Sequence, residues 1–400
     1  MCRLSFVLLV SALVAGALGA TCQRRVCYHT NWSQYRTQPA QFLPSNINAS
    51  LCTHIIYAFA KLSNNQLAPF EWNDDDTATS KGMYSKFNDL KLTNPQLKTL
   101  LAVGGYNLGT APFSQMAATP TTRARFIQTA IKFLRDRKFD GLDLDWEYPA
   151  LRGSPAGDAH LFTLLVQETV DAFDLEQKTS GKPKLLLSAA VAAGKETVDV
   201  AYEISAIASK LDFINLMSYD FHGSWDPVTG HNSPLYAGLL ETGAIRNYNV
   251  DFAAKYWVSK GALKSKINIG LPTYGRSFTL SSVSKNNTGD PAAGAGPAGR
   301  FTQEPGSLSY YEICEMISQG ATVRRSMDQQ VPYLVKGSVW VGYDDPVSLR
   351  NKVKYIKDNG YGGSMLWTLD QDDFTGTFCG QGKFPLTTAV SQECLDVTSG

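Results

Sequence analysis

The chain has 400 residues, of which 44% are hydrophobic and 18% are charged. This composition is typical of a globular protein with one large core or two smaller ones, and it excludes an intrinsically disordered chain. The formal net charge at pH 7 is +1, which gives no electrostatic reason to expect nucleic acid or an anionic membrane as a partner.

The first residues have the pattern of a secretory signal peptide. Arg3 is the only charged residue over 1–20, an apolar stretch covers 4–14, and small residues occupy most of 15–20. The stretch is shorter than the roughly 20 residues that span a bilayer. We therefore predict a signal peptide over 1–20 and a secreted, extracellular protein without a membrane anchor.

Eight short apolar or β-branched runs follow along the chain, each ending in polar or aromatic residues. They cover residues 25–30, 54–59, 99–103, 141–145, 185–191, 213–217, 267–271 and 363–367. Helical periodicity fills intervals such as 126–134 and 349–356, and Asn359-Gly360 is typical of a helix C-terminal cap. This alternation predicts an α/β fold, a (β/α)8 TIM barrel rather than an open doubly wound sheet. No Gly-x-Gly-x-x-Gly follows the first run, which argues against a dinucleotide site.

One interval breaks this rhythm. Residues 274–343 are too long for a simple loop, are rich in Gly and Pro over 289–299, and contain further strand-like pieces. We predict that they form a small α+β insertion between strand 7 and helix 7. The predicted barrel then comprises 21–273 and 344–390, and a C-terminal tail comprises 391–400.

Cysteine usage agrees with export. Cys2 leaves with the predicted signal peptide, and the six cysteines that remain are an even number without zinc-site spacing, which indicates disulfides of undetermined connectivity. Asn48 and Asn286 begin sequons and are predicted glycosylation sites. Asn31 also begins a sequon, but it follows a predicted core strand and we expect it to be sheltered.

An acidic run marks the candidate chemistry. Side chains alternate along a strand, so Asp143, Asp145 and Glu147 share one face, each about 6.6 Å from the next. Buried carboxylates are costly, and crowding raises at least one pKa among them. Glu147 stands at the C-terminal mouth, where barrels place catalytic groups, and is the predicted general acid.

The alternatives for this run are a metal site, a strand end neutralised by Arg or Lys, and a solvated turn. Leu142, Leu144 and Trp146 alternate with the acids, which argues against a turn. A hard cation would need further oxygen ligands that the sequence does not indicate. We therefore expect neither a metal nor a cofactor.

The run Asp140-Gly141-Leu142-Asp143-Leu144-Asp145-Trp146-Glu147 resembles the signature of family-18 glycoside hydrolases. The chain resembles the animal chitinases of that family from about Val26 to about Leu386. Further motifs that carry the resemblance are Tyr57-Ala58-Phe59, Glu71-Trp72-Asn73-Asp74, Met217-Ser218-Tyr219-Asp220, Tyr274-Gly275-Arg276-Ser277-Phe278 and Met365-Leu366-Trp367.

The resemblance implies hydrolysis of β-1,4-linked N-acetylglucosamine polymers with retention, by a substrate-assisted mechanism. Glu147 would be the general acid and base, and Asp145 would orient the substrate acetamido group and stabilise an oxazolinium ion. Asp143 would share a proton behind Asp145, and Tyr219 would bond the acetamido oxygen. The expected partners are chitin and chito-oligosaccharides, and we expect a monomer.

The resemblance also implies a substrate cleft with Trp367 as its floor and aromatic extensions at Trp32, Trp72, Tyr106 and Trp225. The other predicted binding residues are Tyr28, Phe59, Glu71, Gly104, Gly105, Asn107, Tyr148, Met217, Ser218, Asp220, Tyr274, Arg276 and Glu304. Tyr106 and Ser307 depart from the family pattern, which usually has Trp and Met there.

Two disulfides follow from the resemblance, namely Cys27 with Cys52 and Cys314 with Cys379. Cys22 and Cys394 remain, and we predict that they pair because a closed barrel brings its chain ends together. The main alternative function is a chitinase-like lectin that binds chitin oligomers without cleaving them; such relatives typically lack the terminal Glu. A structural matrix protein is a third possibility.

Overall fold

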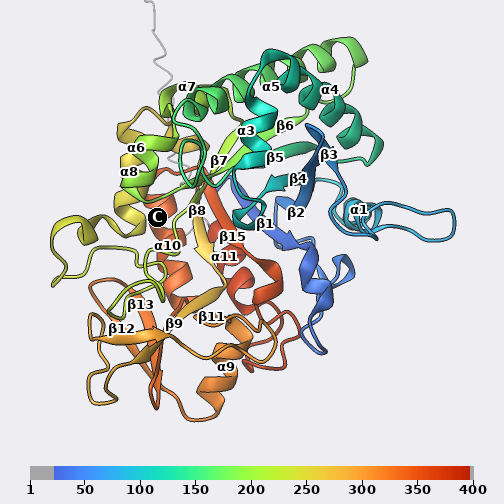
Figure 1. Cartoon of the computed structure of the whole chain (residues 1–400). Helices are drawn as coiled ribbons and strands as arrows, with labels where there is room; N and C mark the ends of the chain where they lie inside the picture. Colours follow the sequence, from blue (N-terminus) through green and yellow to red (C-terminus); the bar gives the residue numbers. More distant parts are fainter. Residues whose placement is uncertain (1–21, 397–400) are drawn as a thin grey trace, which may run out of the picture.

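The computed structural model describes residues 22–396. The predicted signal peptide and the end of the predicted tail, 397–400, lie outside the described residues. Eight parallel strands close into a barrel because β1 pairs with both β15 and β2 (Figure 1). In sheet order they are β1 (Arg24–Thr30), β15 (Gly363–Trp367), β8 (Ile267–Pro272), β7 (Phe213–Met217), β6 (Leu186–Ala192), β5 (Gly141–Asp145), β4 (Lys98–Gly104) and β2 (His54–Ser63). The predicted TIM barrel is confirmed, and each predicted run overlaps one strand.

Helices surround the barrel (Figure 1). They are α1 (Met83–Asn88), α2 (Leu90–Thr93), α3 (Ala111–Ala117), α4 (Pro120–Asp136), α5 (Asp158–Ser180), α6 (Lys195–Ala201), α7 (Ile204–Lys210), α8 (Val250–Ser259), α10 (Pro346–Asn359) and α11 (Pro385–Leu395). Asp345 caps the N-terminus of α10 with its carboxylate, which accepts from the Ser348 amide, and Gly360 caps the C-terminus with φ of 70°. The predicted cap at Gly360 is therefore confirmed. Within residues 22–396, none of the helices has the length and apolar character needed to cross a membrane.

A second, antiparallel sheet lies between β8 and α10. Its strands are β9 (Tyr274–Leu280), β10 (Ala292–Ala295), β11 (Ser307–Ser309), β12 (Thr322–Ser326), β13 (Val331–Lys336) and β14 (Val339–Gly342), and it carries α9 (Tyr310–Ser318). Strand β8 is the seventh barrel strand, so this is the insertion expected between strand 7 and helix 7. A short β3 (Gln66–Ala68) pairs antiparallel with the end of β2.

Alternation along β5 separates two environments. Leu142, Leu144 and Trp146 belong to the large core between barrel and helices, where the Trp146 ring stacks on Phe113 with centroids 5.1 Å apart. Asp143 and Asp145 occupy the intervening positions and are buried inside the barrel. The apolar residues thus fix which face of β5 the acids must take.

The structure contains the three expected disulfides, Cys22–Cys394, Cys27–Cys52 and Cys314–Cys379. The predicted tail is wrong over 391–395, because α11 continues to Leu395. Its buried side chains include Val390 and Cys394, and α11 packs against α10. This apolar contact keeps the segment helical.

Replacing both Cys27 and Cys52 with Ser should lower the free energy of unfolding by about 3 kcal/mol. The disulfide joins residues 25 positions apart and restricts the unfolded chain accordingly. Urea unfolding at 25 °C, followed by tryptophan fluorescence without reductant, measures the change against the unmodified protein. An unchanged midpoint and slope would contradict the expectation.

Candidate active site

The three acids of the predicted signature stand in a row on the inner side of β5 and just beyond it. Asp143 and Asp145 are buried, and Glu147 lies past the strand end at the edge of a cleft. Gly104 of β4 adjoins this row with φ of 125°, and a Cβ there would lie 1.9 Å from the Asp145 carbonyl oxygen. Only glycine permits this close approach of the two strand ends.

Asp143 is the deepest acid and is surrounded by hydrogen-bond donors. Its carboxylate accepts from Tyr28 Oη at 2.7 Å, Ser188 Oγ at 2.6 Å and Asn215 Nδ2 at 3.3 Å. Burial raises the pKa of Asp143 to about 6, and the three donors oppose that rise because they stabilise the anion. Asp143 is therefore suited to hold a negative charge inside the barrel.

Asp145 is also buried but has a poorer environment for charge. Its Oδ1 atom has no hydrogen-bond partner. Burial, followed by the charges of Glu147 and Asp143, raises the pKa of Asp145 well above its usual range. Of the two carboxyl groups, Asp143 is therefore the better site for a negative charge.

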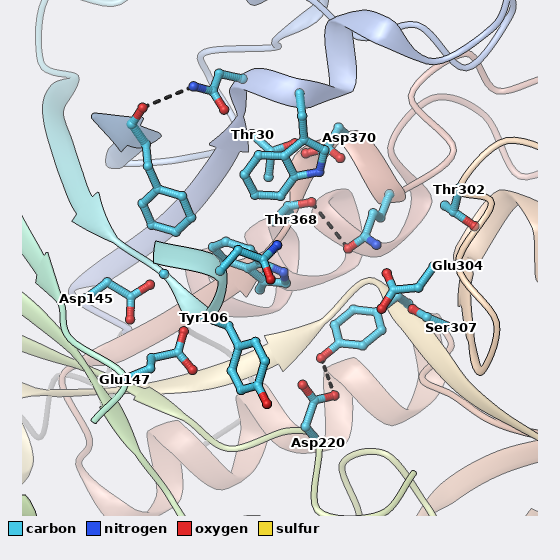
Figure 2. Close-up of a pocket in the computed structure, with 18 of the residues that line it drawn as sticks. Thr30, Tyr106, Asp145, Glu147, Asp220, Thr302, Glu304, Ser307, Thr368 and Asp370 are labelled. Atoms are coloured by element: carbon cyan, nitrogen blue, oxygen red, sulfur yellow. Dashed lines mark hydrogen bonds between the residues drawn. The ribbon is translucent and has the colours of Figure 1, made fainter. Parts of the chain in front are cut away.

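Glu147 faces the cleft. Burial raises the pKa of Glu147 to about 7, and the charge of Asp220 adds to the rise, whereas Tyr148 and Arg152 act in the opposite direction. Figure 2 shows the carboxyl groups of Asp145 and Glu147 close together and turned toward the pocket, beside Tyr106. A carboxyl group that keeps its proton near neutral pH at an open cleft can act as a general acid.

The cleft has a volume of about 1070 Å³ and extends from the barrel mouth to the insertion, where Thr302, Glu304 and Ser307 line it (Figure 2). Asp145, Glu147 and Tyr219 are part of its lining. The other predicted residues that it brings together are Trp32, Phe59, Gly104, Gly105, Tyr106, Asn107, Tyr148, Met217, Asp220, Trp225, Tyr274, Arg276, Glu304 and Trp367.

Aromatic rings form one side of the cleft. The Trp367 ring lies among those of Tyr28, Trp32 and Phe59, at centroid distances of 5.2, 6.3 and 6.0 Å. Tyr106 and Trp225 are more exposed, at 61% and 58%. Such open ring faces can stack on a flat ligand.

Five predicted residues are not among the lining. Tyr28, Asp143 and Ser218 are buried behind it, and the Ser218 hydroxyl donates to the Gly270 carbonyl at 2.9 Å. Trp72 is 83% exposed, and the Glu71 carboxylate accepts from the hydroxyl of Tyr35, a lining residue. Tyr28 and Asp143 therefore lie beneath the cleft without lining it, whereas Glu71 and Trp72 lie at its periphery.

A charged cluster faces the acids from the opposite side. Asp220 Oδ1 accepts from Tyr274 Oη at 2.6 Å and from Arg276 Nε at 2.7 Å. The Arg276 guanidinium also lies 5.3 Å from the Trp225 ring centroid. This ion pair keeps a negative charge near Glu147 in fixed geometry.

Sequence reasoning missed three charged residues of the site. Arg152 lies 3.6 Å over the Tyr106 ring and donates to the Glu147 carbonyl oxygen at 2.8 Å. Arg36 and Asp370 form an ion pair at 2.7 Å in the cleft lining. The three residues follow the carboxyl ends of predicted strands by three to seven positions, and that location was the available signal.

Two further predictions concern surface and metal chemistry. Asn48 is exposed, Asn286 is half-buried, and Asn31 is buried with its amide donating to the Phe59 carbonyl at 3.0 Å, so the expected shelter of Asn31 is confirmed. Among the described residues, no group of His, Cys, Asp and Glu side chains has an arrangement suited to a metal ion.

Comparisons with known proteins find relatives over most of the chain. The model of the glycosyl hydrolases family 18 matches residues 24–372. The chain is 50% identical to chitotriosidase-1 of Mus musculus over 92% of this chain and 77% of that protein. Among solved structures, it resembles an immunomodulatory active chitinase from Trichuris suis, with a TM-score of 0.89, 45% identity and coverage of 94% and 100%. It also resembles human YKL-39, described as a pseudo-chitinase with retained chitooligosaccharide binding, with a TM-score of 0.88, 45% identity and coverage of 93% and 99%.

Replacing Asp220 with Asn should lower the pKa of Glu147 below about 7, because it removes a negative charge that opposes ionisation of Glu147. The carboxyl chemical shift of ¹³C-labelled glutamate, followed by NMR between pH 4 and 9 and assigned with Glu147→Gln, measures this value. Asp226→Asn is the matched control, because Asp226 pairs with His222 at 2.9 Å. Equal shifts in both variants would count against the assigned role of Asp220.

Proposed function

Because the chain belongs to glycosyl hydrolase family 18, we propose that it is a secreted chitinase that hydrolyses β-1,4-linked N-acetylglucosamine polymers with retention. One observation carries this proposal. Glu147 stands at the edge of the cleft beside Asp145, and burial raises its pKa to about 7. A protonated carboxyl group is thus available where a glycosidic oxygen would lie.

In the first step, Glu147 donates its proton to the glycosidic oxygen while the bond from that oxygen to the anomeric carbon breaks. The oxygen of the substrate acetamido group bonds to the same carbon and forms a cyclic oxazolinium ion. The released sugar carries away the proton as a hydroxyl group. In this mechanism the acetamido oxygen of the substrate takes the place of the carboxylate nucleophile that other retaining glycosidases use.

The Asp143–Asp145 pair supplies the compensating charge. The acetamido N–H would donate to Asp145, whose Oδ1 lacks a partner. As positive charge develops on the oxazolinium ion, the single negative charge of the pair is favoured on Asp145, nearest to that ion. Tyr219, which lines the cleft, would donate to the acetamido oxygen and hold it in line with the anomeric carbon.

In the second step, the Glu147 carboxylate takes a proton from a water molecule as that water attacks the anomeric carbon. The bond to the acetamido oxygen breaks, the acetamido group is restored, and Glu147 is again protonated. Two displacements at one carbon retain its configuration. Trp367 would stack beneath the sugar at the cleavage point, and the rings of Trp32, Tyr106 and Trp225 would extend the binding surface.

A chitin-binding lectin or matrix protein with little hydrolysis is the second candidate. It is favoured by the resemblance to human YKL-39, whose description is that of a pseudo-chitinase. The same cleft would serve such a binder. The presence of Glu147, Asp145 and Tyr219 in the lining favours the enzyme instead.

Replacing Glu147 with Gln should lower the release of a fluorophore from a chitobioside by at least about a hundredfold, because it removes the general acid. The control variant is Glu203→Gln, an exposed glutamate paired with His160 outside the cleft. Both variants should still bind chito-oligosaccharides in calorimetry. Wild-type binding without fluorophore release would favour the lectin, and full activity of Glu147→Gln would exclude this residue as the acid.

The pH dependence of kcat/KM should be bell-shaped. Because Glu147 must be protonated, kcat/KM should fall as pH rises through about 7. Because the Asp143–Asp145 pair must carry a negative charge, kcat/KM should also fall as pH drops below about 6. Initial rates on a soluble chito-oligosaccharide between pH 3 and 9 measure both limbs. A rate that keeps rising above pH 8 would contradict the assignment of Glu147.

A further inference from the structure

A chain of hydrogen bonds runs through the barrel interior beneath the acids. Arg24 Nε donates to Asn268 Oδ1 at 2.9 Å, and Asn268 Nδ2 donates to Asn215 Oδ1 at 3.0 Å. Asn215 Nδ2 then donates to Asp143 Oδ1 at 3.3 Å and to Tyr28 Oη at 3.1 Å. The chain therefore connects the start of β1 with the deepest acid of the site.

This interior is otherwise largely apolar. Asn215 and Asn268 have no exposed surface, and residues such as Val26, Leu100 and Phe213 form the surrounding cluster. Buried amides destabilise a protein unless each polar group finds a partner. Both amides are bonded through oxygen and nitrogen alike, so the chain is fully connected from Arg24 to Asp143.

The direction of the chain is set at its far end. A guanidinium group has only donors, so the atom of Asn268 that faces Arg24 must be its oxygen. The nitrogen of Asn268 then faces Asn215, which must present its own oxygen there and its nitrogen to Asp143. Burial lowers the pKa of Arg24 to about 10, and the group remains charged at neutral pH.

We propose that Arg24 and Asn268 are positioning residues that hold the Asn215 amide with its N–H groups toward Asp143, and thereby favour the negative charge of the Asp143–Asp145 pair. This inference rests on the proposed function, in which that charge balances the oxazolinium ion. If the amide turned, its oxygen would face the Asp143 carboxylate. The uncharged form of Asp143 would then be favoured, and catalysis would need a higher pH.

Other groups also face Asp143 and Arg24. Tyr28 on β1 and Ser188 on β6 donate to it, Asp145 and Glu147 follow it in sequence, and β4 places Ala102 beside it. At the far end, the charge of Asp212 acts on Arg24, and the Arg24 guanidinium also donates to the Ser265 carbonyl oxygen. Burial lowers the pKa of His54, and the charges of Arg24 and Lys98 lower it further. Arg24 is therefore the cation that ends the chain.

The test compares four variants by the pH dependence of kcat/KM on a soluble chito-oligosaccharide. Asn268→Leu removes the middle link of the chain, and Arg24→Met removes the donor that sets its direction. Both variants should therefore move the acidic limb up by about one pH unit, which is a roughly tenfold loss of kcat/KM on that limb. Arg24→Lys keeps a donor-only cation and should restore the wild-type limb. Leu100→Val loosens the same interior without a polar change and should lower the Tm while leaving both limbs in place.

A second measurement does not depend on hydrolysis. The carboxyl resonance of ¹³C-labelled Asp143, assigned with Asp143→Asn, should titrate at higher pH in Asn268→Leu and Arg24→Met than in the wild type. If the wild type releases no product, the proposed chitinase activity fails, while this titration still decides the role of the chain. An unmoved Asp143 titration in both variants, or an equal movement in Leu100→Val, would overturn the inference, since a packing role predicts only a change in Tm.

Discussion

The site depends on the confinement of three carboxyl groups to one face of one strand inside a closed barrel. Apolar side chains between them face the helices, so the acids have no other face to occupy. Each charge removed from water costs several kcal/mol unless donors replace the hydration, and Asp145 Oδ1 has no such donor. Ionisation of the whole row at once is therefore unfavourable, and the pKa values of all three acids are raised.

The cost of burying a charge differs among the three acids, because they lie at different depths along β5. Asp143 lies deepest but accepts three hydrogen bonds, Asp145 has an oxygen without a partner, and Glu147 reaches the cleft edge. Similar side chains thus obtain different proton affinities from their surroundings alone. The negative charge is favoured at the bottom of the row, on Asp143, and the pKa values of Asp145 and Glu147 above it are both raised.

Much of this could be predicted from the sequence, because both periodicities are local. The eight apolar runs predict the barrel, and the alternation of Asp143, Asp145 and Glu147 with apolar residues predicts their shared face. Apart from the disulfides and the residues that the family resemblance implies, contacts between distant segments could not be predicted. In the sequence, Asn268 is a single polar residue within a predicted strand, and nothing nearby indicates its partner Arg24, which lies 244 positions away. The helical state of 391–395 similarly depends on packing against α10.

The interior network bears on the choice between hydrolysis and binding. Aromatic rings and donors in the cleft would serve a lectin and an enzyme equally well, and high overall similarity extends to a pseudo-chitinase. A bound acetamido N–H would give the Asp145 oxygen a partner in a binder and in an enzyme alike, but the negative charge favoured by three donors on Asp143 has no counterpart in a neutral sugar. A negative charge held there is of use where a positive charge develops in a transition state. The network beneath Glu147 therefore supports the proposed hydrolysis more than it supports recognition of a sugar alone.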